Sequence, residues 1–243
     1  MIYGEFAELY DELFDPEMYA NWVQFVLKHA NGGSLLDLAC GNGRLAIELA
    51  HRGFTPSGLD LSDAMLAIAS QKASASNVSL PLYNGNMLDL AGLATFQTIT
   101  CFDDSICYLH DQTELATLFK QVAAHLDNDG TFLFDVITPY QTDVIYPGYM
   151  YNYHDETRAF MWRSYAGEFE HSVEHDLAFF NYNPEKDAYD EFSELHLERT
   201  YPLQTYLRAL NAAGFTKVTP SADFGTSEIN PKTTRWFFVA RRG

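Results

Sequence analysis

The chain has 243 residues, of which 47% are hydrophobic, so it is long enough to bury a large core and is not a disordered polymer. Its 15 basic and 33 acidic residues give a net charge of −18, which disfavours a nucleic-acid partner because phosphate backbones are bound largely by lysine and arginine. No apolar run approaches the roughly 20 residues of a membrane span, and the acidic N-terminus does not resemble a signal peptide. We therefore expect a cytoplasmic protein without a membrane partner.

The first part of the chain alternates helical and strand-like segments. Helices are expected at 17–30, 44–52, 62–75 and 112–126, the third with Ser62 as its N-cap. Short apolar runs predict strands at 34–38, 55–59, 78–83, 98–102 and 131–137, the last of them after a turn at 128–130. Strands that alternate with helices in this way predict a parallel sheet covered by helices on both faces.

The pattern changes between about 140 and 201, where aromatic residues are frequent. Polar and apolar residues alternate with a period of two in 159–165, 171–182 and 191–201, which predicts antiparallel strands of a small inserted sheet. A helix at 202–213 and two strands near 216–222 and 235–241 follow, and these last strands are close enough to form an antiparallel hairpin. We expect 1–139 and 202–243 to form one domain, and 140–201 to form a β subdomain that covers an acceptor site.

A glycine-containing turn follows the first predicted strand. In residues 35–46 (LLDLACGNGRLA) an apolar strand leads through a tight turn into a helix. Gly41 and Gly43 lack a Cβ, so the backbone can pass close to a ligand there, and the free N–H groups of the following helix can bind a carboxylate or phosphate. This turn is the strongest candidate for a ligand site in the sequence.

Two cofactor classes compete for the turn. Gly41, Gly43 and Ala46 formally match the dinucleotide fingerprint, and Asp60 has the spacing of its ribose-binding acid, so an NAD-dependent oxidoreductase is one alternative. Asp37, however, lies in the end of the strand, where a carboxylate would repel a pyrophosphate and attract a positively charged ligand. S-adenosylmethionine (SAM) is such a ligand, because it carries a sulfonium, an ammonium and one carboxylate.

The segment LLDLACGNG (35–43) resembles motif I of class I SAM-dependent methyltransferases, and GLDLS (58–62) resembles their next motif. The resemblance implies a Rossmann-like seven-stranded sheet, mostly parallel, with an antiparallel C-terminal hairpin. It also implies that Asp37 orients the methionyl end of SAM and that Asp60 holds the ribose hydroxyls. The other residues expected to line the cofactor in these motifs are Ala39, where the family often has glycine, Gly41, Asn42, Gly43 and Leu61.

Three further segments resemble parts of the same cofactor site. Asn86 and Met87 match the positions that bond the adenine amino group and pack on the ring, although the family usually has aspartate at the first; a surface loop with Met87 in the core is the alternative. Asp103 and Asp104 follow the fourth strand, where they border the transferred methyl or start the next helix. Tyr10 belongs to an N-terminal segment that forms a lid in relatives, although its aromatic residues could instead attach a first helix to the sheet.

The acceptor is expected to be a small molecule with a nucleophilic nitrogen or oxygen. Methyl transfer depends mainly on proximity and orientation, and a base is needed only where the attacking atom must lose a proton. Glu194 and His196 lie on one face of a predicted strand and are the candidates for contacting the acceptor or taking its proton; a solvated sheet face is the alternative. His171 and His175, about 13 Å apart on a strand, are too distant to share a metal, so no metal site is expected.

These patterns leave the identity of the acceptor and the oligomeric state open, with a monomer or homodimer expected. A SAM-binding regulator without turnover is a third alternative, because a cofactor motif does not by itself establish catalysis.

Overall fold

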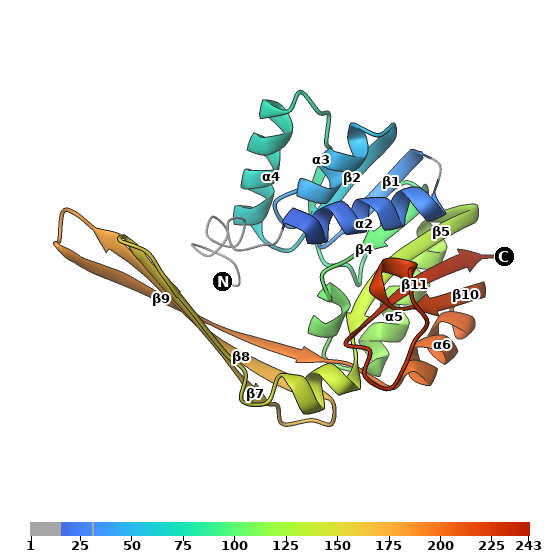
Figure 1. Ribbon diagram of the computed structural model, residues 1–243. Coiled ribbons are helices and arrows are strands. Elements are labelled where there is room, and N and C mark those ends of the chain that lie inside the picture. Colours follow the sequence, from blue (N-terminus) through green and yellow to red (C-terminus); the bar gives the residue numbers. More distant parts are fainter. Residues whose placement is uncertain (1–15, 31) are drawn as a thin grey trace.

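The computed structural model describes residues 16–30 and 32–243, which form two β-sheets and the helices around them (Figure 1). The larger sheet has seven strands in the order β10-β11-β5-β4-β1-β2-β3. Its strands are β1 (Gly33–Leu38), β2 (Phe54–Asp60), β3 (Leu82–Asn84), β4 (Phe96–Cys101), β5 (Leu126–Ile137), β10 (Phe215–Ser221) and β11 (Arg235–Arg242). All neighbours in this sheet are parallel except β11, which pairs antiparallel with both β5 and β10. The predicted fold class is therefore confirmed.

Helices cover both faces of this sheet because its central strands are apolar on both sides. The helices are α2 (Pro16–His29), α3 (Arg44–Ala50), α4 (Asp63–Ala75), α5 (Gln112–His125) and α6 (Leu203–Ala212). Leu35 and Leu133 pack in one cluster with α2 and α3, whereas Leu36 and Phe132 pack in another with α5 and α6. Adjacent residues of one strand thus serve opposite faces, as the two-residue repeat of a strand requires. No helix within the described residues is long and apolar enough to cross a membrane.

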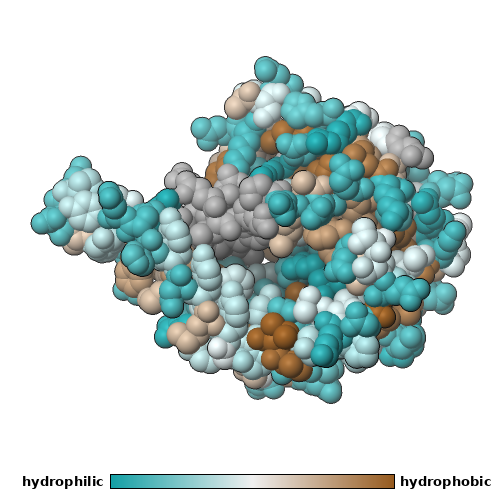
Figure 2. Space-filling view, viewed as in Figure 1, coloured by the Kyte–Doolittle hydropathy of each residue, from teal (hydrophilic) through white to brown (hydrophobic). Residues whose placement is uncertain are grey.

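The smaller sheet is antiparallel, has the order β6-β7-β8-β9, and extends away from the larger sheet as an arm (Figure 1). Its strands are β6 (Met150–His154), β7 (Arg158–Ala166), β8 (Ser172–Asn183) and β9 (Ala188–Arg199). Figure 2 shows that the visible surface of the arm is mostly hydrophilic. At its root the arm contacts the short helices η1 (Ser105–Tyr108) and η2 (Gln141–Ile145), which lie beyond the ends of β4 and β5. A third short helix, η3 (Asp223–Gly225), follows β10.

Two predicted boundaries are wrong for identifiable reasons. The third strand, expected at 78–83, is reduced to β3 because Pro81 has no N–H for a strand ladder and contributes only its carbonyl to Gly58. The turn expected at 128–130 lies inside β5: the pairing with β4 jumps from Leu126 to Thr131, and Asp129 adopts a φ of 63°. The intervening residues form a bulge rather than a separate turn.

Candidate functional site

Acidic residues gather where the central parallel strands end. Asp37 lies at the end of β1, Asp60 at the end of β2, and Asp103 and Asp104 directly after β4. Because β4, β1 and β2 are adjacent and parallel, these carboxyl groups share one edge of the sheet. Crevices at the carboxyl edge of such sheets are where ligands bind in this type of fold.

The turn after β1 depends on left-handed backbone conformations. Ala39, Gly41 and Gly43 have φ values of 53°, 52° and 74°. A Cβ on Gly41 would meet nothing within 4 Å, so this glycine faces open space, whereas a Cβ on Gly43 would lie 2.9 Å from the Cβ of Ala69 in α4. The two glycines therefore serve different purposes: Gly41 leaves room for a ligand, and Gly43 permits close packing of α3 on α4. Ala39 has a left-handed conformation that glycine adopts without strain. This is a physical reason for the glycine that resembling methyltransferases often have at this position.

Asp37 is a buried carboxyl group that is held by a neighbouring hydroxyl. The residue is 3% exposed, and its side chain accepts a 2.6 Å hydrogen bond from the Thr100 hydroxyl on β4. Burial raises the pKa of Asp37 to about 7, although the hydrogen bond from Thr100 lowers it and the charge of Asp60 raises it again. A positively charged ligand at this edge would stabilise the ionised form.

Asp60 connects the end of β2 to the glycine turn. Its Oδ2 accepts from the Gly41 N–H at 2.7 Å, and its Oδ1 accepts from the Ser62 N–H at 2.9 Å. Each carboxylate oxygen keeps a further lone pair for a ligand hydroxyl. Leu61, the next residue, is 67% exposed and places a large apolar side chain at the rim of the same edge.

The remaining residues predicted to contact a cofactor have mixed placements. Asn42 is buried and its Oδ1 accepts from the Arg44 N–H at the start of α3. Asn86 is exposed, and its Oδ1 accepts from the Leu88 N–H, while Met87 packs in the core with α5 and α6. Tyr10 lies outside the described residues.

Asp103 and Asp104 follow β4 in consecutive left-handed conformations, with φ values of 58° and 47°. Asp104 is the first residue of a buried charge network: Arg235 on β11 donates to it at 2.8 Å and lies 3.1 Å from Asp135 on β5. Asp135, which is fully buried, also accepts from the backbone N–H of Asp104 and from the indole of Trp22 on α2. Asp104 begins η1 but makes no side-chain capping bond there. Sequence analysis did not identify Arg235 or Asp135, because their pairing joins residues far apart in the chain.

The root of the arm brings the two predicted catalytic residues to the same edge. Glu194 and His196 lie on the inward face of β9, and His196 Nε2 is 3.0 Å from Glu194 Oε2. On the other side of the ring, Nδ1 is 2.7 Å from the hydroxyl of Tyr108, which belongs to η1. A proton on Nε2 satisfies Glu194, so Nδ1 accepts from Tyr108. The solvated-face alternative is excluded for His196, which is 5% exposed, whereas its neighbours Leu195 and Leu197 are 58% and 56% exposed.

The other predicted histidines are placed differently. His171 was expected on a strand, but it lies in the turn before β8. It has a φ of 57°, and its side chain is 2.7 Å from Asp143. His175 is buried on β8. Within residues 16–30 and 32–243, no three metal-ligating side chains gather in a way that could hold a metal ion.

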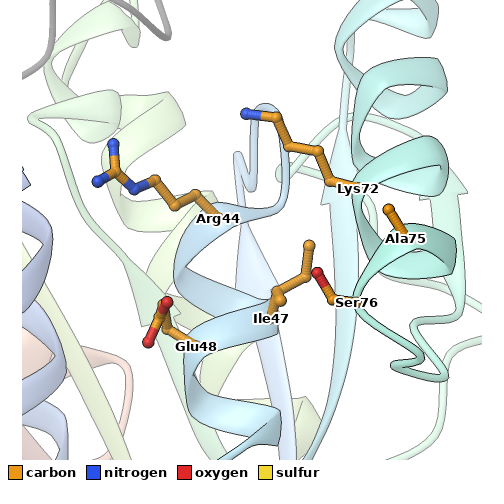
Figure 3. A pocket seen from close by; sticks show the side chains of 6 residues that line it. All are labelled: Arg44, Ile47, Glu48, Lys72, Ala75 and Ser76. Atoms are coloured by element: carbon orange, nitrogen blue, oxygen red, sulfur yellow. The ribbon is translucent and has the colours of Figure 1, made fainter.

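A hollow of about 280 Å³ lies between α3 and α4 (Figure 3). Arg44 at the start of α3 and Lys72 in the last turn of α4 contribute to its lining, together with Ile47, Glu48, Ala75 and Ser76. None of the acids described above lines it, so it is not part of the candidate site.

The strand order, the glycine turn and the acids after β1 and β2 define a Rossmann-like protein that binds a nucleoside at the carboxyl edge of its sheet. A family model described as a methyltransferase domain matches residues 35–130. A protein of Geobacillus sp. (strain WCH70) that is named as a methyltransferase is 37% identical over 248 residues, with 100% of both chains covered. The chain belongs to the class I SAM-dependent methyltransferases, and its cofactor is SAM.

Two solved structures share this architecture over the full length of the chain. A SAM-dependent methyltransferase from Clostridium acetobutylicum ATCC 824 has 26% identity and a TM-score of 0.87, with 100% of both chains covered. The sugar N-methyltransferase KedS8 from Streptoalloteichus sp. ATCC 53650 has 25% identity and a TM-score of 0.78, with coverage of 100% of this chain and 96% of that one. Family membership sets aside the NAD-dependent alternative.

Proposed function

We propose that this methyltransferase acts on a nitrogen or oxygen atom of a small-molecule acceptor, which binds between the carboxyl edge of the larger sheet and the root of the arm. The observation that carries the proposal is the Glu194–His196–Tyr108 chain of hydrogen bonds, which brings β9 and η1 together at that edge. The net charge of −18 argues against a nucleic-acid acceptor, and the structural relative KedS8 acts on a sugar nitrogen.

The cofactor roles follow from the site described above. When bound, SAM supplies an electrophilic methyl group on a sulfonium. Asp37 would attract the positively charged methionyl end, Gly41 would leave room for the backbone of the ligand, and Asp60 would accept from the ribose hydroxyls. Leu61 and Met87 would contribute apolar side chains for the adenine, and Asn86 would supply a polar group for its amino group. The remaining cofactor-lining positions that we propose are Tyr10, Ala39, Asn42, Gly43, Asp103 and Asp104.

The acceptor side needs a route for a proton. Glu194 fixes the orientation of the His196 ring, so that Nδ1 presents a lone pair to the Tyr108 hydroxyl. Tyr108 takes a proton from the acceptor and passes its own to His196, which frees a lone pair on the attacking atom. This is general base catalysis through one intervening hydroxyl.

Substitution of the base tests the assignment. We expect His196→Ala to lower kcat by roughly 10²-fold or more, because general base catalysis contributes on that order, while SAM affinity measured by calorimetry stays unchanged. The substrate assay is the transfer of a labelled methyl group from SAM to an extract of small metabolites. His154→Ala, which removes an exposed histidine of β6, is the matched control.

Full turnover by His196→Ala would refute the role of the histidine. An intact wild-type chain that binds SAM but labels no small molecule would instead indicate a SAM-binding regulator.

A further inference from the structure

Two buried groups at the root of the arm have unused hydrogen-bonding atoms. Glu198 on β9 is 7% exposed and His175 on β8 is 2% exposed, yet Glu198 Oε2 and His175 Nε2 have no hydrogen-bond partner among the described residues. Buried polar atoms are nearly always satisfied in folded proteins, so these two unpartnered atoms at a ligand-binding edge indicate a hydrogen-bonding group that is supplied by a ligand. Glu198 shares the inward face of β9 with Glu194 and His196.

The surroundings of His175 determine which of its nitrogens carries the proton. Trp162 Nε1, which can only donate, lies 3.1 Å from His175 Nδ1, and the Ser164 hydroxyl lies 2.8 Å from the same atom. Nδ1 is therefore the acceptor, and the proton of the neutral ring is on Nε2, which faces Glu198 Oε1 at 3.8 Å. Burial lowers the pKa of His175 to about 4, so the ring is neutral at physiological pH.

The charges around Glu198 favour a cation. Burial raises the pKa of Glu198, and the negative charge of Asp104 raises it further. A hydrogen bond with the Tyr108 side chain and the positive charge of Arg235 lower this pKa, and the negative charge of Asp103 raises it again. Arg235 is already engaged by Asp104 and Asp135. The carboxyl groups at this edge therefore exceed the available cationic side chains, and a positively charged ligand group would let Glu198 ionise without leaving the protein interior.

We propose that Glu198 receives the protonated amine of the acceptor at its Oε2, and that His175, whose Nε2 lies 3.8 Å from Glu198 Oε1, is a positioning residue that confines the Glu198 carboxyl on its buried side. This inference rests on the proposed function and narrows the acceptor to a primary or secondary amine. An alcohol of the same shape would bring no charge with which to ionise Glu198.

The proposed site accounts for every proton in the reaction. The bound ammonium gives one proton to the Tyr108 hydroxyl, which passes its own to His196 Nδ1, and the nitrogen lone pair is then free. A nitrogen–carbon bond forms as the carbon–sulfur bond breaks, and the electron pair of that bond remains on sulfur. The product keeps one positive charge on nitrogen, which Glu198 still balances.

The nature of the methylated atom is the first test. The wild-type protein is incubated with a metabolite extract and SAM that carries ¹³C in its methyl group, and the product is examined by NMR. We expect an N-methyl carbon; an O-methyl or C-methyl product would overturn the inference while leaving the methyltransferase assignment intact. An absence of labelled product would count against the proposed function itself, so the two failures are distinguishable.

Substitution of Glu198 is the second test, with the methylated acceptor's parent amine as the probe. Glu198→Gln keeps the size but removes the charge, and we expect it to raise KM for the amine about tenfold or more, because hydrogen bonds to charged groups are the stronger ones. Glu198→Asp keeps the charge on a shorter side chain and should restore part of that loss. Glu191→Gln, the same change at an exposed position of β9, is the matched control and should leave KM unchanged.

If Glu198 had a purely structural role, KM would be higher in Glu198→Asp than in Glu198→Gln, because the isosteric glutamine would be tolerated better than the shorter aspartate. That order, with SAM affinity equal in all variants, would overturn the inference. His175→Gln should raise KM severalfold and leave SAM affinity unchanged; an unchanged KM would refute its positioning role. Melting temperatures and calorimetry with S-adenosylhomocysteine establish that each variant is folded.

Discussion

The cofactor edge and the root of the arm are built in different ways. The cofactor edge consists mainly of residues 33–62, in which one strand, a turn, a helix and a second strand follow each other directly. The root of the arm takes Tyr108 from η1, His175 from β8, and Glu194, His196 and Glu198 from β9. The first site is specified by local backbone geometry, whereas the second exists only after distant segments have packed together.

The difference separates what the two regions contribute to the enzyme. A contiguous turn with fixed backbone N–H groups suits one invariant cofactor. A site built from a separate sheet can exchange side chains on one face of a strand without disturbing the turn, because neighbouring residues of a strand serve opposite faces. We therefore expect changes at the cofactor edge to alter SAM binding alone and changes at the root to alter acceptor use alone. Arg235 is the exception, because its partners lie on β5 and after β4, beneath both regions.

The largest effect is expected from Arg235→Met, which should impair both the cofactor edge and the root of the arm. The substitution leaves the buried carboxyls of Asp104 and Asp135 without their cation, and breaking a buried ion pair costs about 3–5 kcal/mol of the free energy of unfolding. Urea denaturation measures the loss. Arg241→Met, at a half-buried position of the same strand, is the control and should cost much less. Equal losses in the two variants would show that the ion pairs of Arg235 contribute no more to the free energy of unfolding than the contacts of Arg241.

The next effect concerns the cofactor edge alone. Asp60→Ala removes the acceptor for the Gly41 and Ser62 N–H groups and for the ribose hydroxyls, so we expect SAM affinity to fall about 100-fold in calorimetric titrations, on the scale of two lost hydrogen bonds to a charged group. Asp63→Asn, an exposed acid three residues further on, is the matched control. Unchanged affinity in Asp60→Ala would place the ribose elsewhere.

The smallest effect, taken per pH unit, is a pH dependence carried by Asp37. Its pKa is about 7 in the folded protein because the carboxyl is buried, and 3.8 is its ordinary value, so the native state holds the proton more tightly than the unfolded chain. The free energy of unfolding should therefore fall as pH rises from about 4 to about 7, by at most about 1.4 kcal/mol per pH unit. Asp37→Asn should lack this part of the slope.

Cofactor binding should show the opposite trend over the same interval. SAM affinity should rise as Asp37 ionises, by up to about tenfold per pH unit, and the Asp37→Asn substitution should remove the rise. Urea denaturation and calorimetry at a series of pH values, each taken as the difference between the wild type and the variant, measure the two slopes. Parallel curves for the two proteins would mean that Asp37 does not meet the charge of SAM.

Short-range patterns in the amino-acid sequence were enough to predict the helix-covered parallel sheet and the glycine turn, and the resemblance of residues 35–43 and 58–62 to known motifs indicated the SAM-dependent methyltransferase family. Alternation of strands and helices, glycines that permit positive φ, and an acid at the end of a strand are all visible within a few residues. The same kind of pattern placed Glu194 and His196 on one strand face, since a two-residue repeat is local. The contacts of that face depended on the fold.

The partners of these residues became visible only in the folded chain. Tyr108 meets His196 across 88 positions of the chain, and Arg235 meets Asp104 across 131, so no local pattern could indicate either contact. Glu198 and His175 were not distinguished as a pair because their importance lies in burial and in missing partners, which are properties of packing. Hydrophobic periodicity reports which face of an element is buried, but the chemistry of a site assembled from several elements depends on which faces meet.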